Sequence, residues 1–293
     1  MPYHQVVLEL PGRELARAED ACTSLGAIAV SLADAGDEPL LEPAPGETPL
    51  WQAVRLRALF EVSVNPEVTA ATLAVVLGLP AGAITVEHVE DRVWEREWLK
   101  DFRPMRFGRR LWVAPAGQRP DGHAPVILDL DPGLAFGTGT HATTALCLEW
   151  LDGRIRGGER VLDYGCGSGI LGLAALKLGA ASAAAFDIDP QAITATRENA
   201  AKNGLAARVE VVERSEPLAG TYDIVLANIL AGPLIELAPR LARFARARGE
   251  LVLAGMLTRQ AAEVAQAYGP WFDIAPEAER EGWSLLAGRR RAE

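Results

Sequence analysis

The chain has 293 residues, of which 49% are hydrophobic and 23% charged, so it can form one large domain or two modest ones with ordinary cores. Its formal net charge of −10 argues against general binding to the phosphate backbone of nucleic acids. The start, MPYHQVVLEL, has no basic region followed by an apolar core, and the longest apolar stretch is interrupted by Lys177 and two glycines. We therefore expect neither a signal peptide nor a membrane span.

The distribution of charge and of cysteines bears on the partner and the cellular compartment of the protein. Residues 1–105 hold 17 Asp/Glu and 8 Lys/Arg, a net of −9, which either attracts a basic partner or keeps the surface solvated. The three cysteines, Cys22, Cys147 and Cys166, have no CxxC spacing and no histidines clustered around them. This pattern predicts buried, reduced thiols in a cytoplasmic protein and no metal site. No segment resembles a dimerisation helix, so we expect a monomer.

The first ninety residues alternate between strand and helix patterns. Asn65 and Pro66 are typical of a helix start, since asparagine caps and proline fits the first helical turn. The order β-α-β-β-α-β predicts a small ferredoxin-like α+β domain over residues 1–90. Its expected strands cover residues 4–10, 27–34, 54–62 and 83–89, and its expected helices cover residues 11–25 and 66–77.

A linker and a second domain follow. Trp94, Trp98 and Phe102 recur every four residues, which predicts a bridging helix that Pro104 would stop, so we assign a linker helix to residues 91–108. Residues 109–293 alternate strands and helices in the manner of a doubly wound α/β sheet. Strands are expected at 126–130, 160–164, 183–187, 209–213, 223–228, 250–257 and 283–288, and helices through 146–150 and over 170–178 and 190–203. Ligands bind such a sheet outside the carboxyl ends of its strands.

The stretch VLDYGCGSGIL, residues 161–171, indicates where that ligand binds. Gly165, Gly167 and Gly169 follow a strand and precede a helix, so the backbone can turn tightly there and approach a ligand closely. The spacing is G-x-G-x-G, whereas the nicotinamide fingerprint is G-x-G-x-x-G. A dinucleotide site, a site for another adenosine cofactor and a tight turn without ligand are the three interpretations. We expect Gly165 and Gly167 to contact a cofactor.

Two further strand ends carry polar side chains. Asp187 follows the next strand by about twenty residues and could accept hydrogen bonds from both ribose hydroxyls of an adenosine, whereas Asp189 would cap the following helix. Asn228 ends a central strand, where apolar residues are usual. It either caps a helix or faces the reacting atom. Because carboxyl ends of parallel strands share one edge of the sheet, we expect Asp187 and Asn228 near Gly165.

The segment DPGLAFGTGTHATT, residues 131–144, is richer in glycine and threonine than a connector requires. It could fold over a small ligand and exclude water. Thr144 would lie in the first turns of the next helix, where its hydroxyl could reach the cofactor. His141 is a candidate base, although a single histidine at a helix start more often has a structural role.

These motifs, with FDIDPQAI, ENAAKNG and VLANILAGPL in the same order, resemble the ribosomal protein L-eleven methyltransferase family. The resemblance implies a class I methyltransferase fold and S-adenosyl-L-methionine as cofactor, bound by Thr144, Gly165, Asp187 and Asn228. It also implies that the substrate is a lysine-rich, basic protein of the large ribosomal subunit, methylated on lysine side-chain amines and at its amino terminus. The front domain would recognise that protein, with no direct binding to nucleic acid.

The residues suggest how such a reaction would proceed. The side-chain oxygen of Asn228 and the carbonyl of Ile229 or Leu230 could accept hydrogen bonds from the acceptor amine. Asp163 would either orient the glycine turn, reach the methionine amino group through water, or only stabilise the turn. The alternatives are a nicotinamide oxidoreductase, a methyltransferase for RNA or a small molecule, and an inactive binding module. The oxidoreductase does not explain the glycine spacing or Asn228, and the acidic front domain argues against RNA.

Overall fold

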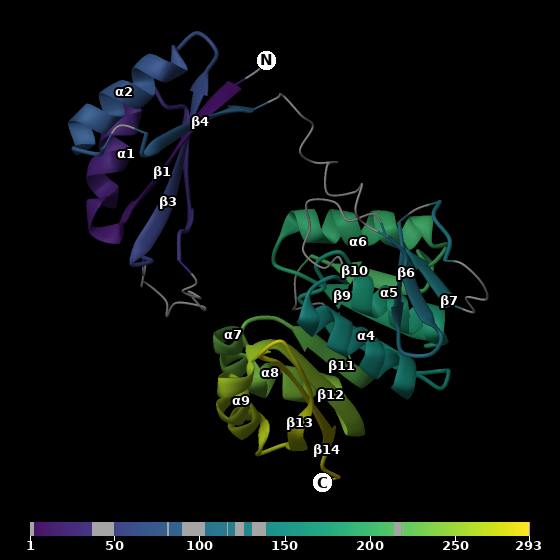
Figure 1. Cartoon of the computed structure of the whole chain (residues 1–293). Helices are drawn as coiled ribbons and strands as arrows, with labels where there is room; N and C mark the ends of the chain where they lie inside the picture. Colours follow the sequence, from purple (N-terminus) through teal and green to yellow (C-terminus); the bar gives the residue numbers. More distant parts are fainter. Residues whose placement is uncertain are drawn as a thin grey trace. The chain divides into compact units, whose positions relative to one another are not determined.

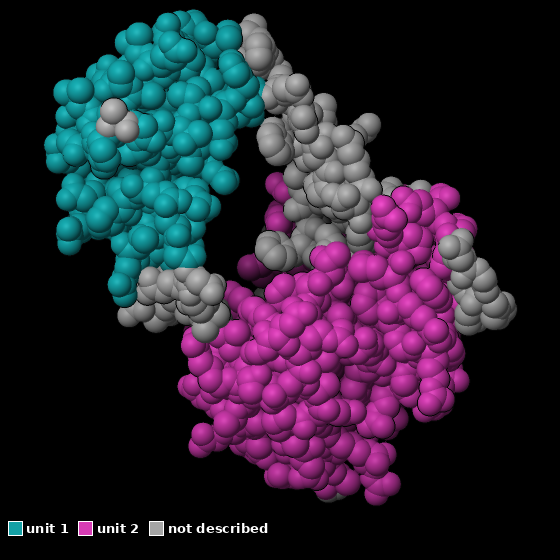
Figure 2. Space-filling model, in the orientation of Figure 1, with its two compact units in different colours: residues 1–93 teal, residues 94–293 magenta. Residues whose placement is uncertain are grey.

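The computed structural model describes residues 3–36, 50–80, 82–89, 103–115, 117–120, 126–130, 139–213, 218 and 220–292. The chain divides into two compact units, residues 1–93 and 94–293 (Figure 2). Each has its own hydrophobic core, and each is described by itself below.

The first unit is a four-stranded antiparallel sheet with two helices. Its strand order is β2-β3-β1-β4, which is the order of a ferredoxin-like domain, so this prediction is confirmed (Figure 1). Side chains from alternate positions of β1 and β3, such as Leu8 and Phe60, are buried with Leu73 of α2. The elements are β1 (Tyr3–Pro11), α1 (Leu15–Ser24), β2 (Ala29–Asp34), β3 (Ala53–Glu61), α2 (Pro66–Leu77) and β4 (Ile84–Val89).

The two helices of this unit begin for different reasons. The Asn65 side chain accepts hydrogen bonds from the main-chain N–H groups of Glu67 and Val68, both at 3.1 Å, so it caps α2 as predicted. The first helix differs from its prediction, because Pro11 ends β1 and a short 3-10 turn over Gly12–Glu14 precedes α1. A proline at the end of a strand gives up no hydrogen bond that the sheet needs.

The second unit is built around a seven-stranded sheet with the order β10-β9-β8-β11-β12-β14-β13, which confirms the doubly wound prediction. The first five strands in this order are parallel, and β14 is antiparallel to both its neighbours. The strand order reverses between β8 and β11, the point at which doubly wound sheets bind ligands. The strands are β8 (Arg160–Tyr164), β9 (Ser182–Phe186), β10 (Val209–Val212), β11 (Tyr222–Asn228), β12 (Ala245–Leu257), β13 (Phe272–Arg280) and β14 (Trp283–Arg290).

Helices cover both faces of this sheet, as Figure 1 shows. One core contains side chains of α4 (Ala142–Arg154), α5 (Ile170–Leu178) and α6 (Pro190–Lys202). The other contains those of α7 (Ala231–Glu236), α8 (Ala238–Phe244) and α9 (Ala261–Tyr268). The alternation of strand and helix therefore yields three layers, with β8 and β11 buried in the middle.

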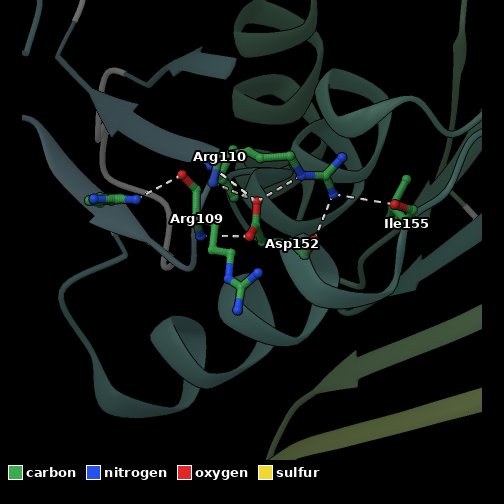
Figure 3. A network of polar contacts seen from close by, with 6 residues as sticks. Arg109, Arg110, Asp152 and Ile155 are labelled. Atoms are coloured by element: carbon green, nitrogen blue, oxygen red, sulfur yellow. Dashed lines mark hydrogen bonds and ion pairs between the residues drawn. The ribbon is translucent and has the colours of Figure 1, made fainter. Parts of the chain in front are cut away.

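A smaller sheet of β5 (Met105–Phe107), β6 (Leu111–Ala114) and β7 (Val126–Asp129) packs on α4 and α5. Asp152 on α4 holds the turn between β5 and β6 (Figure 3). Its carboxylate accepts hydrogen bonds from the main-chain N–H groups of Arg109 (2.7 Å), Arg110 (3.1 Å) and Leu111 (3.2 Å). The Arg110 side chain adds an ion pair at 3.3 Å to the same carboxylate.

Three further differences from the sequence analysis lie in the second unit. The linker helix lies outside the described residues over 91–102, and its last residues are strand β5, so no helix extends to residue 108. The last strand of the parallel set begins at Ala245, ahead of the predicted residue 250. No strand was predicted over β13, whose Pro276 and charged residues are unusual in a strand. Pro276 is tolerated because β13 is an edge strand and its pairing with β14 is irregular after Pro276.

Two further findings concern only the described residues. None of the helices there is long and apolar enough to cross a membrane. The same residues contain no group of three or more His, Cys, Asp or Glu side chains that could hold a metal ion.

Candidate active site

The glycine turn leaves β8 at the switch point and is fixed to the end of β9. The main-chain N–H groups of Gly165 and Cys166 both donate to the carbonyl of Phe186, at 2.7 and 3.0 Å. Gly165 has a φ of 78°, in the left-handed region that favours glycine. Gly167 and Gly169 also have positive φ, so the alternate spacing of the three glycines matches a backbone that turns left-handed at every second residue.

Asp187 lies directly after β9 and contacts this turn. Its Oδ2 accepts a hydrogen bond from the N–H of Gly167 at 2.8 Å, and its Oδ1 accepts one from the N–H of Asp189 at 3.0 Å. A carboxylate can accept about four hydrogen bonds, so about two remain for a ligand with two adjacent hydroxyls. Asp189 caps α6 by accepting a hydrogen bond from the N–H of Gln191.

Asn228 ends β11, and its side chain reaches α4. Its Nδ2 donates to the hydroxyl oxygen of Thr144 at 3.3 Å, which joins two of the predicted site residues. Within the described residues the Asn228 Oδ1 has no hydrogen bond, so it can accept one. The carbonyl of Leu230 already accepts a hydrogen bond from Leu234 in the first turn of α7, so it is engaged.

Two residues of α6 that were not predicted as site residues support the glycine turn from behind. The Thr196 hydroxyl donates to the carbonyl of Gly167 at 3.0 Å, and the Asn199 Nδ2 donates to the carbonyl of Ser168 at 3.0 Å. A side chain at Gly169 would lie within 2.8–3.2 Å of Thr196 atoms, so the third glycine allows α6 to approach. Asn199 belongs to the ENAAKNG motif, which was the only signal for this role in the sequence.

Asp163 is fully buried beneath the turn. Its Oδ2 accepts a hydrogen bond from the N–H of Gly172 at 2.8 Å, whereas its Oδ1 has no partner within the described part of the chain. Burial raises the pKa of this carboxyl to about 7, and the charge of Asp187 adds to the rise, while the Gly172 hydrogen bond opposes it. Burial likewise raises the pKa values of the Cys147 and Cys166 thiols, which form no disulfide. Both thiols therefore stay protonated and are poor nucleophiles.

The contacts of His141 are those of a residue that stabilises the start of α4. It is the N-cap of α4, where its Nδ1 accepts a hydrogen bond from the N–H of Thr143 at 3.3 Å and lies 2.7 Å from the Thr143 hydroxyl. Its ring packs edge-on against Trp283 at 4.8 Å. The predicted loop ahead of it, residues 131–138, lies outside the described residues.

The arrangement combines a cradle and an acceptor at one edge of the sheet. The glycine turn and Asp187 supply main-chain curvature and a carboxylate with spare acceptor capacity, which fits the ribose of an adenosine cofactor. The amide of Asn228, held by Thr144, supplies a neutral oxygen acceptor next to that cradle. A neutral acceptor suits a nucleophile that carries N–H groups, because it binds the amine without favouring its protonated form as a carboxylate would.

Comparison with other proteins agrees with this chemistry. The chain matches the family described as Ribosomal protein L11 methyltransferase (PrmA) over residues 2–291. The protein named ribosomal protein L11 methyltransferase from Pseudomonas paraeruginosa is 49% identical over 294 residues, which cover 100% of both chains. The protein of the same name from Azotobacter vinelandii is 48% identical over 99% of this chain and 100% of its own.

A solved structure is similar as well. The ribosomal protein L11 methylase from Lactobacillus delbrueckii subsp. bulgaricus has a TM-score of 0.60 and 34% sequence identity, and the match covers 65% of this chain and 100% of that chain. About two thirds of the fold therefore corresponds to a solved chain in its entirety.

Proposed function

Because this chain belongs to the ribosomal protein L11 methyltransferase family, we propose that it transfers methyl groups from S-adenosyl-L-methionine to amines of that ribosomal protein. The acceptors are lysine side chains and the amino terminus. The observation that carries the proposal is the 49% identity with a relative of that name over the full length of both chains. No relative reported above is an oxidoreductase, so the nicotinamide alternative is set aside.

The cofactor would be held at the switch point of the seven-stranded sheet. Asp187 would accept hydrogen bonds from the ribose hydroxyls, and the turn at Gly165 and Gly167 would allow the main chain to approach the cofactor closely. Ile188, which follows Asp187 and is 89% exposed, offers an apolar surface for the adenine ring. Thr144 would act through its hydrogen bond to Asn228 at the same edge of the sheet.

When bound, the cofactor supplies a methyl group that its sulfonium sulfur already activates. The protein then needs no covalent nucleophile and has to hold the amine in line with the bond that breaks. A free lysine amine has a pKa of about 10.4 and must lose its proton before it can attack. Removal of the amine from water and the nearby positive charge both lower that pKa. Asn228 Oδ1 would accept a hydrogen bond from the neutral amine and direct its lone pair.

The first unit would recognise the protein substrate. Residues 1–105, which contain this unit, have a net charge of −9, and an acidic surface attracts a lysine-rich partner from a distance. The two units provide separate cores for recognition and for chemistry. We further propose that the protein is cytoplasmic, which the three buried free thiols support because such thiols suit a reducing compartment, and that it is a monomer.

Mass spectrometry tests this function directly. The ribosomal protein is incubated with the enzyme and S-adenosyl-L-methionine that carries a deuterated methyl group. We expect labelled methyl groups on lysine side chains and on the amino terminus. An unlabelled ribosomal protein, together with labelled ribosomal RNA in a parallel incubation with whole ribosomes, would contradict the proposal and favour the RNA alternative.

A further inference from the structure

Ile229 lies between two glycines that come from different strand ends. A methyl group added to Gly165 would lie closer than 3.0 Å to the Cγ2 atom of Ile229, nearer than non-bonded carbons approach. A methyl group added to Gly255 would lie 2.7 Å from the carbonyl carbon of Ile229 and 2.9 Å from its nitrogen. The side chain of Ile229 therefore occupies the space that Gly165 leaves, and its main chain occupies the space that Gly255 leaves.

Gly255 sits in an irregularity of β12 that makes room for this contact. Leu253 pairs with Leu286 and Met256 pairs with Ser284, so two residues of β12 oppose one residue of β14. Gly255 has a φ of 90°, which favours glycine. The carbonyl of the residue before it, Ala254, accepts the hydrogen bond of the Ile229 N–H at 3.1 Å. Such bulges are frequent next to active sites, where they redirect the chain.

We propose that Ile229 is a positioning residue that locks the end of β11 to the glycine turn. This inference rests on the proposed function, in which Asn228 orients the acceptor amine and the turn at Gly165 holds the cofactor. Ile229 is bonded to Asn228 and packs against Gly165, so it fixes the distance between donor and acceptor. Methyl transfer depends steeply on that distance, whereas cofactor binding does not.

Two conservative substitutions separate this role from simple packing, because the one that keeps the full volume is the one expected to lose activity. Ile229→Val keeps the Cγ2 methyl group that faces Gly165, and Ile229→Leu keeps the volume but loses the branch at Cβ. We expect kcat to fall about tenfold in Ile229→Leu and less than about twofold in Ile229→Val, with cofactor affinity changed by less than about threefold in both. Ile224→Leu is the matched control, because Ile224 is buried near the opposite end of β11. It should lower the melting temperature and leave kcat unchanged.

A rescue experiment tests the geometry itself. Ile229→Ala should raise the kcat of Gly165→Ala, but only as far as the reduced kcat of Ile229→Ala alone, since it removes both the side chain that the new methyl group would meet and the positioning contact. It should not restore Gly255→Ala, because Gly255 faces main-chain atoms that every residue has. Equal kcat in Ile229→Leu and Ile229→Val, or rescue of both glycine variants, would overturn the proposal. Normal turnover in Asn228→Ala would instead overturn the role of the amide, whatever Ile229 does.

Discussion

At the residue scale, the hydrogen bonds of Asp187 allow us to predict how cofactor affinity changes when its carboxylate is removed. Its two oxygens accept hydrogen bonds from the N–H groups of Gly167 and Asp189, so the carboxylate holds the turn, and under the proposed function it also binds the ribose. We expect Asp187→Ala to weaken S-adenosyl-L-methionine binding by about 10-fold to 100-fold, since two charge-assisted hydrogen bonds are lost. Isothermal calorimetry measures the change. Unchanged affinity would mean that the ribose binds elsewhere.

Asn228 should affect a different quantity. Its Nδ2 is bound to Thr144, and its Oδ1 is available to the acceptor amine. Asn228→Ala should therefore lower kcat by about 100-fold and change cofactor affinity much less, because it would remove the proposed hydrogen bond to the reacting amine. Thr144→Val is the companion variant, which keeps the shape of Thr144 and removes the hydrogen bond that orients the amide. Equal losses in kcat and in cofactor affinity for Asn228→Ala would contradict this assignment.

Asp163 predicts a pH dependence of stability. Its folded-state pKa is raised by burial from 3.8 to about 7, so the folded protein retains a proton that the unfolded chain releases. The free energy of unfolding should therefore fall as pH rises from about 4 to about 7, by about 1.4 kcal/mol per unit from this group. Asp163→Asn stays neutral and keeps an oxygen for Gly172. Urea titrations from pH 4 to 8 should show that the free energy of unfolding of the variant rises relative to that of the wild type as pH rises. An equal pH dependence of the two free energies would contradict this prediction.

At the element scale, Asp152 connects α4 to the turn between β5 and β6, the contacts drawn in Figure 3. Asparagine has one acceptor oxygen and no charge, so Asp152→Asn leaves at least one main-chain N–H group without a partner and weakens the contact with Arg110, which should cost about 2–3 kcal/mol of unfolding free energy. Asp273→Asn is the control, because the Asp273 side chain is 76% exposed and its ion pair with Arg291 contributes little. Urea titration of both variants checks the contrast. A similar loss of unfolding free energy in the two variants would show that burial of the carboxylate does not determine the loss.

The same scale shows which elements the sequence predicts well. Helix α5 begins and ends at its predicted residues because Gly169 and Gly179 bound an apolar run. Strand β13 was missed, since its pairing with β14 supplies the hydrogen bonds that its own composition does not favour. The short strand β5 likewise exists through its pairing with β6. Local pattern therefore predicts most elements, including the edge strand β10, whereas β13 and β5 form because a neighbouring strand pairs with them.

In the candidate site, too, the positions of the residues could be predicted from the sequence, whereas their contacts could not. Gly165, Asp187 and Asn228 could be predicted to share an edge, because each ends a parallel strand of one sheet. Their partners could not be predicted. The hydrogen bond from Asn228 to Thr144 spans 84 positions in the chain, and the support from Thr196 depends on how α6 packs. Spacing places residues at an edge, but it does not say which neighbouring side chain each one contacts.

At the scale of the whole molecule, the division into two units indicates that cofactor binding and substrate recognition can be separated. Residues 94–293 contain both cores of the seven-stranded sheet and all the proposed cofactor contacts. These residues have hydrophobic cores of their own, so we expect this unit to fold alone. Deleting residues 1–90 should therefore leave cofactor affinity unchanged by calorimetry and abolish methylation of the ribosomal protein.

The reason lies in how the substrate is held. Under the proposed function the first unit binds the substrate, and the covalent linker would then raise the effective concentration of that substrate at the second unit, an advantage that two separate chains lose. Supplying residues 1–90 as a separate chain should therefore restore little methylation of the ribosomal protein, even at equal concentration. Methylation at the full-length rate by the truncated enzyme would show that the first unit does not recognise the substrate. Full recovery by the separate unit would instead show that the linker contributes nothing and that recognition acts on the ribosomal protein itself.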